Sequence, residues 1–300
     1  MNGIIVIDKE STYTSFDVVA IVRGILKQKK IGHSGTLDPM ATGVLPVLVG
    51  TAAKAQSLLP DTDKEYIADF KLGMTTDTLD ITGKVLSETQ CNASSDDIQK
   101  ILPDFRGDIM QIPPLYSAVQ KNGVRLYDLA RQGIEIEREA RPVSVTKLEL
   151  MEFDETKKCG RLIISCSKGT YIRVICDDIG KALGCGCVMT ALRRTSACGF
   201  NIDDAFTLAQ LQKIKDENRI EEIILPVDSI FKCYDEVTVS DKQAVRFSNG
   251  ASLSLDRLKK LKNIDDGKIL RVYGNEKFIG LGVTDISSGE LKLKKNFYMK

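Results

Sequence analysis

The chain has 300 residues with 42 Lys/Arg and 41 Asp/Glu, and its hydrophobic share of 43% excludes a largely disordered chain. Its length predicts about two domains, and its net charge of +1 gives it no basic character as a whole. Asp8 and Lys9 end the opening apolar run, and no run approaches the roughly 18 residues of a membrane-spanning helix, so we expect a cytoplasmic protein with no membrane contact.

Apolar patterning predicts alternating strands and helices over the first two thirds of the chain. Thr14 or Ser15 is a good N-cap for an amphipathic helix, and Asp17 lies in its first turn. Tyr66 and Leu72 share one face of an alternating segment. In chain order we expect a strand at 3–8, a helix from 14 or 15 that ends in the basic residues 27–30, strands at 44–49 and 64–72, helices at 51–59 and 96–102, an antiparallel strand pair at 148–153 and 160–166, and a helix from 171 or 172 to 183 with Asp177 and Asp178 on its polar side.

Two later segments have a different character. Residues 111–142 contain two adjacent prolines and several charges, which predicts a hairpin or protruding loop with a helix around 127–132. Residues 226–235 read as a connection, and the β-type runs at 269–273 and 278–283 predict a small β-barrel. Residues 236–300 carry 13 Lys/Arg and 8 Asp/Glu, a net +5, whereas the rest of the chain has a net −4. This distribution fits a phosphate-binding domain, and an ordinary solvated basic surface fits it equally well.

The cysteines are expected to be reduced thiols packed as small apolar groups. Cys185 and Cys187 are too close in sequence for a normal zinc knuckle, no CxxC pair occurs, and the sole histidine, His33, is distant in sequence. We therefore expect no metal site. The eight are Cys91, Cys159, Cys166, Cys176, Cys185, Cys187, Cys198 and Cys233.

The richest local pattern is the segment 32–46, GHSGTLDPMATGVLP. Its glycines and prolines restrict the backbone closely, and a buried strand follows. Asp38 is therefore expected on a shaped loop that enters a sheet, where catalytic groups are often held. Taken alone, the same pattern fits an ordinary turn whose Asp bonds to nearby backbone.

Four further segments extend this pattern in order along residues 4–230. They are Lys64-Glu65-Tyr66 with Leu72-Gly73 and Thr76-Asp77-Thr78-x-Asp80; Pro113-Pro114-Leu115-Tyr116-Ser117-Ala118 with Lys121, Gly123, Arg125, Tyr127, Ala130 and Arg131; Ser167-Lys168-Gly169-Thr170-Tyr171-Ile172-Arg173; and Ala191-Leu192-Arg193-Arg194-Thr195. Together the five segments resemble the signature of the TruB family of pseudouridine synthases. The resemblance implies a mixed α/β catalytic domain on a largely antiparallel sheet at residues 1–230, an RNA-embracing segment at about 111–142, and a PUA-like RNA-binding domain at 236–300.

The resemblance also implies an activity, the isomerisation of a uridine in the T-loop of tRNA, at position 55, to pseudouridine. This reaction breaks the N1–C1′ bond and rejoins the ring through C5 without redox change or net hydrolysis, so no cofactor is expected. Asp38 is the expected catalytic group, acting as nucleophile or as base. Arg173 is expected to keep Asp38 ionised and oriented. Tyr66 is expected to stack on the flipped base, and Leu192 to wall the pocket against water.

The remaining expected site residues contact RNA. The base must be extruded from the RNA loop, and His33 is placed to brace the space that it leaves. Tyr171 and Lys64 belong to motifs around the pocket. Basic side chains are expected to position the T-arm stem-loop through its backbone: Lys29, Lys30, Arg125, Arg131, Arg193 and Arg194.

Two departures from the family pattern and three alternatives accompany this interpretation. Glu10 stands where the family often has proline, and Val188 where it commonly has histidine. A guide-RNA-dependent relative that modifies ribosomal RNA shares the catalytic motifs, although this chain lacks extended basic tails and is expected to need no obligate protein partner. A non-catalytic RNA-binding protein would not need Asp38, Tyr66 and Arg173 together, and an aspartate-dependent hydrolase would release free base or cleave the strand.

Overall fold

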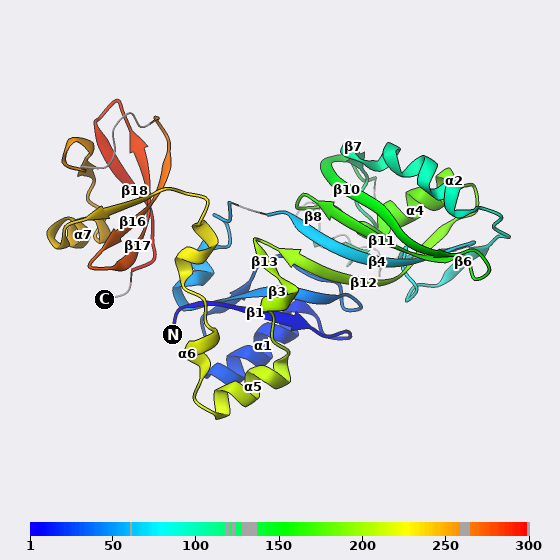
Figure 1. Cartoon of the computed structure of the whole chain (residues 1–300), viewed down its shortest axis with the longest axis horizontal. Helices are drawn as coiled ribbons and strands as arrows, with labels where there is room; N and C mark the ends of the chain where they lie inside the picture. The colour runs from blue at the N-terminus through cyan, green and yellow to red at the C-terminus, as the bar shows by residue number, and fades with distance from the viewer. Residues whose placement is uncertain are drawn as a thin grey trace.

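A mixed, largely antiparallel nine-stranded sheet forms the body of the molecule (Figure 1). The computed structural model describes residues 1–60, 62–117, 120–121, 124–125, 127, 137–258 and 265–298. Seven strands lie side by side in the order β1 (Gly3–Lys9), β3 (Thr42–Val49), β12 (Cys187–Ala197), β4 (Lys64–Leu72), β11 (Cys159–Cys166), β10 (Arg141–Asp154) and β7 (Gly107–Gln111). β2 (Ile31–His33) pairs with β3, and β13 (Phe200–Asn201) pairs with β12. Among the described strand pairs of this sheet, only β12 and β3 run parallel, so the predicted sheet type is confirmed.

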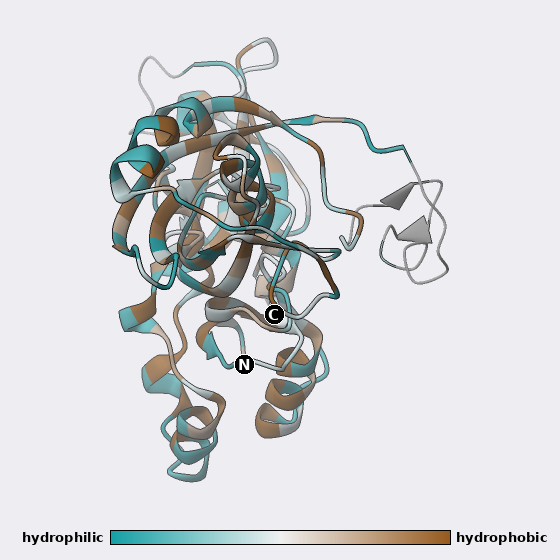
Figure 2. Ribbon diagram, turned by 90° about the vertical axis from the view of Figure 1, so that its right-hand side faces the viewer, coloured by the Kyte–Doolittle hydropathy of each residue, from teal (hydrophilic) through white to brown (hydrophobic). Residues whose placement is uncertain are grey.

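Helices cover the apolar face of this sheet. α1 (Ser15–Leu26) begins with the predicted cap, since Thr14 and Asp17 form a capping box. In β4, Tyr66 and Leu72 share the buried face, as the alternation predicted. Helices and sheet together enclose one large apolar core, and the helices alternate brown and teal in Figure 2 as amphipathic helices do. The other helices of the body are α2 (Ser95–Ile101), α4 (Ile172–Ala182), α5 (Leu208–Asp216) and α6 (Ile220–Ile223), with 3₁₀ helices η1 (Gly50–Ala55), η2 (Leu102–Phe105), η3 (Ile202–Asp204) and η4 (Val227–Phe231).

Two local predictions were wrong. The segment predicted as a helix at 51–59 is the short 3₁₀ helix η1, because Gly50 has φ +66 and Asn2 accepts a hydrogen bond from the Thr51 amide, which holds the segment against β1. Asp177 does not face solvent. It is buried and pairs with Lys181 at 2.6 Å, so the ion pair replaces the lost hydration.

The segment 111–142 is described only in part. Two short hairpins lie in this half of the chain, β5–β6 (Met74–Thr76, Val85–Glu88) and β8–β9 (Gln120–Lys121, Val124–Arg125). The latter falls within the predicted protruding segment, while the helix predicted around 127–132 lies outside the described residues apart from Tyr127.

The C-terminal residues form a second, curled sheet beside the body (Figure 1). Its order is β14 (Glu236–Val239), β16 (Ile269–Gly274), β17 (Lys277–Asp285), β18 (Glu290–Asn296) and β15 (Leu253–Ser254), with α7 (Asp241–Ser248) and η5 (Leu255–Arg257) at its side. Leu281 and Phe297 of this sheet pack with Ile4 and Val6 of β1 in one apolar cluster. The two sheets therefore share a core. Within the described residues, no helix is both long and apolar enough to span a membrane.

Gly43 lies where β3 approaches β12 closely. It has φ +103, and a Cβ there would lie 2.1 Å from the carbonyl oxygen of Arg194 on β12. We predict that Gly43→Ala lowers the free energy of unfolding by more than about 2 kcal/mol, because the strands must separate. Gly24 in α1 is the matched control, since a Cβ at that position would have no neighbouring atom within 4 Å.

Gly24→Ala is expected to raise the same free energy by about 0.5–1 kcal/mol, the ordinary helix effect. Chemical denaturation of the two variants gives both values. Equal effects would show that the β3–β12 contact imposes no constraint on residue 43.

Candidate active site

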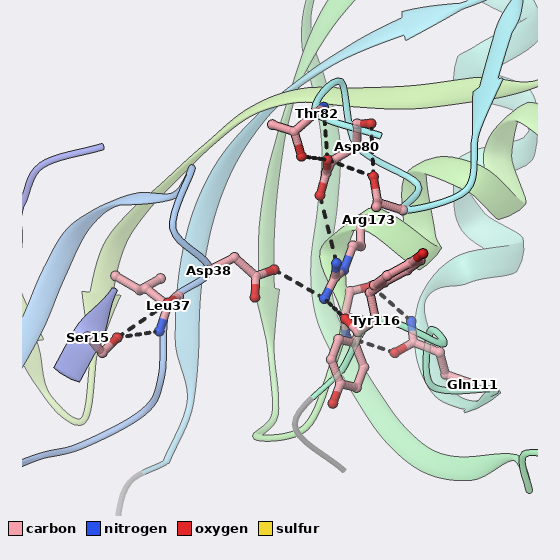
Figure 3. Close-up of polar contacts among 10 residues, drawn as sticks. Ser15, Leu37, Asp38, Asp80, Thr82, Gln111, Tyr116 and Arg173 are labelled. Carbon is pink, nitrogen blue, oxygen red and sulfur yellow. Dashed lines mark hydrogen bonds and ion pairs between the residues drawn. The ribbon is translucent and has the colours of Figure 1, made fainter. Parts of the chain in front are cut away.

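Asp38 lies on the loop between β2 and β3, and several contacts shape that loop. The Ser15 hydroxyl, at the start of α1, accepts a hydrogen bond from the Leu37 amide at 2.9 Å (Figure 3). The Ala41 amide donates to the Asp38 carbonyl at 3.0 Å, closing a turn over Pro39. The Asp38 side chain is 40% exposed. The loop is thus rigidly held while its carboxylate remains accessible.

A buried lysine anchors the loop from below. Lys9, at the end of β1, has no exposed surface, and its Nζ donates to the carbonyls of Tyr13 at 2.6 Å, Glu10 at 2.9 Å and Pro39 at 3.2 Å. Three carbonyl acceptors satisfy all three ammonium protons. Burial lowers the pKa of Lys9 to about 8, and the carboxylate of Asp38 opposes that shift. Lys9 was not predicted as a site residue, because its acceptors come from loops that only the fold brings together.

Arg173 connects the two halves of the site. Its Nη2 lies 3.3 Å from Oδ2 of Asp38 and donates to the Tyr116 carbonyl at 2.7 Å, while its Nη1 lies 3.7 Å from Oδ2 of Asp80 (Figure 3). The side chain is only 7% exposed. The predicted pairing of Arg173 with Asp38 is therefore present in the geometry, and a second carboxylate supports it from the opposite side.

Asp80 is the second carboxylate, on the turn between β5 and β6. Its Oδ1 accepts from the hydroxyl of Thr78 at 2.9 Å, and from the hydroxyl and amide of Thr82 at 2.5 and 3.0 Å. The sequence motif contained Asp80 without a role for it. The surrounding Thr78-x-Asp80-x-Thr82 spacing could have predicted that role, because it is typical of a carboxylate held by a turn.

The side chain of Gln111 orients the helix that carries Arg173. It accepts from the Tyr171 amide at 2.8 Å and donates to the Tyr171 carbonyl at 3.1 Å (Figure 3). Tyr171 is the N-cap of α4 and has no side-chain cap of its own. Gln111 therefore supplies the partner that a helix start requires, and it was missed because it lies 60 residues away in sequence.

Tyr66 is buried on β4, and the guanidinium of Arg194, on the neighbouring strand β12, acts on its hydroxyl electrostatically. Burial raises the pKa of Tyr66, and the Arg194 guanidinium opposes that shift. Arg194 also donates to the carbonyls of Val44 at 2.7 Å and Gly35 at 3.0 Å, and it has no exposed surface. The prediction that Arg194 contacts an RNA phosphate was wrong. Arg194 instead binds the loop before Asp38 through Gly35, and its positive charge acts on Tyr66 from within the protein.

One pocket of about 90 Å³ brings the predicted catalytic residues together. Asp38 and Arg173 form its polar part, and Leu192 and Met189 its aliphatic part. The lining residues are Thr36, Leu37, Asp38, Tyr66, Thr170, Tyr171, Ile172, Arg173, Met189 and Leu192. An aromatic ring, a paired carboxylate and an apolar wall around one small space suit a planar polar ring that reacts away from water.

The other expected substrate contacts lie at different depths around the Asp38 loop. His33 is half-buried with its ring edge-to-face on Phe16 at 6.0 Å, and burial lowers its pKa, which favours the neutral ring. Lys64 is half-buried and donates to the Thr62 carbonyl at 3.0 Å, and burial lowers its pKa also. Neither side chain is a fully solvated cation.

The basic residues predicted to contact phosphates also differ from one another in how exposed they are. Lys29 and Lys30 are exposed beyond the end of α1. Arg193 is partly exposed but is already paired with Asp8, at 2.8 Å. The side chain of Arg125 and the whole of Arg131 lie outside the described residues. Lys29 and Lys30 are therefore the described cations most open to RNA among those predicted.

The buried Lys9 gives a pH-dependent prediction. An unfolded chain holds its lysine proton up to about 10.5, whereas Lys9 in the folded chain releases it near 8. Between these values the unfolded state binds more protons, so stability rises with pH there. We expect the free energy of unfolding of the unmodified chain to rise from pH 8 to 10.5 relative to that of Lys9→Met, as measured by denaturant titration at each pH. Parallel curves for the two proteins would contradict the burial of a titrating Lys9.

Comparisons with known proteins find the same family that the sequence motifs resemble. The model of the TruB family pseudouridylate synthase N-terminal domain matches residues 23–172, and that of the tRNA pseudouridylate synthase B C-terminal domain matches residues 173–232. The tRNA pseudouridine synthase B of Clostridium acetobutylicum is 44% identical over 283 residues, 94% of this chain and 95% of that protein. The protein of the same name from Clostridium tetani is 42% identical over 287 residues, 94% of this chain and 95% of that protein.

A solved structure shares the fold over almost the whole chain. A chain from the crystal structure of a Cbf5-Nop10-Gar1 complex superposes with a TM-score of 0.74 at 28% identity, covering 99% of this chain and 85% of that one. The match includes the curled C-terminal sheet as well as the body. With two family models that together span residues 23–232 and relatives more than 40% identical over most of their length, this chain belongs to the TruB family of pseudouridine synthases.

Proposed function

We propose that this chain isomerises a uridine of tRNA to pseudouridine, and that its target is the uridine at position 55 in the T-loop. The observation that carries the proposal is the convergence of Asp38, Tyr66, Arg173 and Leu192 on one pocket from four separate elements. The names of the relatives support tRNA as the substrate. The T-loop and position 55 follow from the motif resemblance. Such an activity suits a cytoplasmic protein.

Asp38 is proposed as the reacting carboxylate. It is the accessible acid of the pocket, and it can attack the nucleoside as a nucleophile or remove a proton as a base. Arg173 orients it, and Asp80 in turn orients Arg173. The pair of carboxylates compensates the buried guanidinium, which would otherwise be costly to hold out of water.

Tyr66 and Leu192 are proposed to hold the ring while its glycosidic bond is broken. The detached uracil must rotate so that C5 replaces N1 opposite C1′, and it must not escape during that step. An aromatic face and an aliphatic wall permit rotation, because stacking and apolar contacts have little directional preference within the ring plane. Tyr171 lines the same pocket, with the Arg173 guanidinium 5.8 Å from its ring centre.

His33 is proposed to brace the RNA after the uridine has left its stack. It lies on β2, just before the loop that carries Asp38, and its neighbour Phe16 is 69% exposed. A neutral histidine and an exposed phenylalanine offer flat faces for stacking on unpaired bases. Lys64, Lys29, Lys30, Arg193, Arg125 and Arg131 are proposed to contact the RNA backbone.

We propose two domains, with the catalytic unit at residues 1–230 and a PUA-like RNA-binding unit at 236–300. The separate curled sheet and its positive net charge support this division. Since Leu281 and Phe297 belong to one apolar cluster with Ile4 and Val6 of β1, the two units are expected to fold together. Residues 111–142 are proposed to embrace the stem-loop.

A guide-RNA-dependent function is the second candidate, because the neighbours in the Cbf5 complexes share the fold. The curated relatives are covered to 95% of their length, against 85% for the Cbf5 chain, which favours the stand-alone enzyme. Incubating the pure chain with an unmodified tRNA transcript and mapping its nucleosides distinguishes the two. Pseudouridine at position 55 without any added RNA or protein supports our proposal, and a strict need for a guide RNA contradicts it.

Asp38→Asn is expected to reduce pseudouridine formation at least about 1,000-fold, because an amide can neither attack nor take a proton at neutral pH. The affinity for tRNA should change little, since the two side chains have the same shape. Single-turnover nucleoside analysis and filter binding measure the two quantities. Near-normal turnover would remove Asp38 from the reaction.

Asp80→Asn is expected to lower the single-turnover rate about 10–100-fold by loosening Arg173, with tRNA affinity unchanged. Asp77→Asn is the matched control on the same hairpin, since Asp77 accepts from the Lys84 amide and lies outside the pocket. The control should keep its rate. An equal loss in both variants would mean that the hairpin, and not the Asp80–Arg173 contact, is what the reaction requires.

The basic C-terminal surface is tested by charge removal, because deletion would expose the apolar cluster shared with β1. Lys242, Arg246 and Lys294 are exposed. Replacing all three by Gln is expected to weaken tRNA binding about 5–30-fold and to flatten its salt dependence. The control is the double variant Lys100→Gln/Lys157→Gln, whose lysines are paired with Asp97 and Asp154. Unchanged affinity in the triple variant would argue against RNA contact there.

A further inference from the structure

Two cysteines that the proposed reaction does not use lie in contact. The Sγ atoms of Cys91 and Cys185 are 2.9 Å apart, although the residues are 94 positions apart in sequence. Cys91 lies between β6 and α2, and Cys185 lies in the turn that joins α4 to β12. Both thiols are reduced in the structure. A disulfide requires the sulfurs to approach to about 2.05 Å, so closing the gap takes a movement of less than about 1 Å.

Backbone hydrogen bonds connect the two segments that carry the cysteines, and the turn around Cys185 is flanked by glycines. The Gly73 amide donates to the Gly186 carbonyl at 3.0 Å, and the Thr89 amide donates to the Gly73 carbonyl at 2.9 Å. These two bonds hold the segments of Cys91 and Cys185 on either side of Gly73. Cys185 stands between Gly184 and Gly186, with φ of +72 and +76. Glycine on both sides lets the turn adjust at low cost.

We propose that Cys91 and Cys185 are a modification site, a thiol pair that a peroxide converts into a reversible intramolecular disulfide. One thiolate attacks a peroxide oxygen, the O–O bond breaks, and a sulfenic acid and hydroxide form. The second thiol then attacks the sulfenic sulfur and displaces its oxygen as water. In total, two thiols lose two electrons and two protons, and hydrogen peroxide is reduced to two waters. A dithiol reductant reverses the change by exchange.

The surroundings of the pair determine its rate. Cys91 and Cys185 are 9% and 7% exposed, so a small oxidant reaches them only with a slight opening of the surface. Burial raises the pKa of Cys185 to about 11, which keeps the thiolate fraction small at neutral pH. Oxidation is therefore expected to be slow and to accelerate as the pH rises. Cys176 and Cys187 are buried more deeply, at 0% and 1% exposed.

The position of the pair defines what a disulfide would constrain. Gly73 and Thr89 form the base of the β5–β6 hairpin, whose turn carries Asp80. Cys185 follows the last turn of α4, the helix whose first turn carries Arg173. In Figure 1, β6, α2 and α4 lie together at the end of the molecule away from the C-terminal sheet. The disulfide would fasten the base of the Asp80 hairpin to the far end of the Arg173 helix and leave the pocket open.

The test uses the full-length chain, first reduced and then treated with hydrogen peroxide at about pH 8, where more of the thiol is ionised than at neutral pH. Free thiols are alkylated under denaturing conditions, and the protein is digested with trypsin. Cys91 lies in the peptide 85–100, and Cys185 shares the peptide 182–193 with Cys187. We expect to find these two peptides linked by a disulfide, and the mass of the linked species should be two hydrogens less than the sum of the two peptide masses. Dithiothreitol should separate them again. Fragmentation within 182–193 assigns the sulfur.

Three variants sharpen the assignment. Cys91→Ser and Cys185→Ser should each abolish the linked peptide, whereas Cys187→Ser should leave it. The oxidised unmodified chain should melt about 5–10 °C higher than the reduced chain, because the link closes a long loop in the unfolded state. Oxidised Cys91→Ser should show no such rise.

Two results would overturn the proposal. A linked peptide that persists in Cys185→Ser would move the pairing to Cys187. Oxidation confined to the exposed Cys233, with the 85–100 peptide fully alkylated, would show that the pair does not react. Both outcomes are read from the peptides, so they are independent of whether the chain isomerises tRNA.

Discussion

A buried positive charge is the constraint on which the site depends. The guanidinium of Arg173 is almost wholly removed from water, and it is held by two carboxylates and a backbone carbonyl. An unpaired charge there would be very costly. The fold must therefore bring Asp38 and Asp80 to opposite sides of one helix start. That requirement links the β2–β3 loop, the β5–β6 hairpin and α4 into one unit.

Two more buried cations support the same loop from beneath. Lys9 donates all three of its protons to carbonyls, and Arg194 donates to the carbonyls of Gly35 and Val44. Each of these bonds replaces hydration with a fixed partner, so the loop has little freedom to move. A reacting carboxylate gains from this rigidity because its orientation is prepared before the substrate arrives. Asp38, the proposed reacting carboxylate, can then remain exposed.

Local patterns predicted most of the regular structure. The N-cap at Thr14, the alternation in β4 and the β-type runs of the C-terminal sheet depend on neighbours within a few residues, and the structure has each of them. The predicted helix at 51–59 failed because a contact with Asn2, far away in sequence, decided its backbone. The predictions that Arg194 contacts a phosphate and that Asp177 faces solvent were wrong for a related reason. A charged residue next to other polar residues in sequence is usually exposed, and only tertiary partners make its burial possible.

The residue types expected at the site can be read from the sequence. It contains an aspartate in a rigid Gly/Pro-rich loop, an arginine at a helix start, a tyrosine on a strand and a leucine directly before two arginines. The residues alone predict only a rigidly held acid, and the resemblance carried by their types and order implies its counter-charge, a stacking face and an apolar wall. The groups that support them became apparent only in the folded chain: Lys9 at the base of the loop, Asp80 as the second partner of Arg173, and Gln111 at the start of α4. The contact of Cys91 with Cys185, outside the pocket, also arises only from the fold. Hydrogen bonds and ion pairs act over about 3 Å in space whatever the separation along the chain, so partners such as Arg194 and Gly35, 159 residues apart, become visible only when the sheet has brought them together.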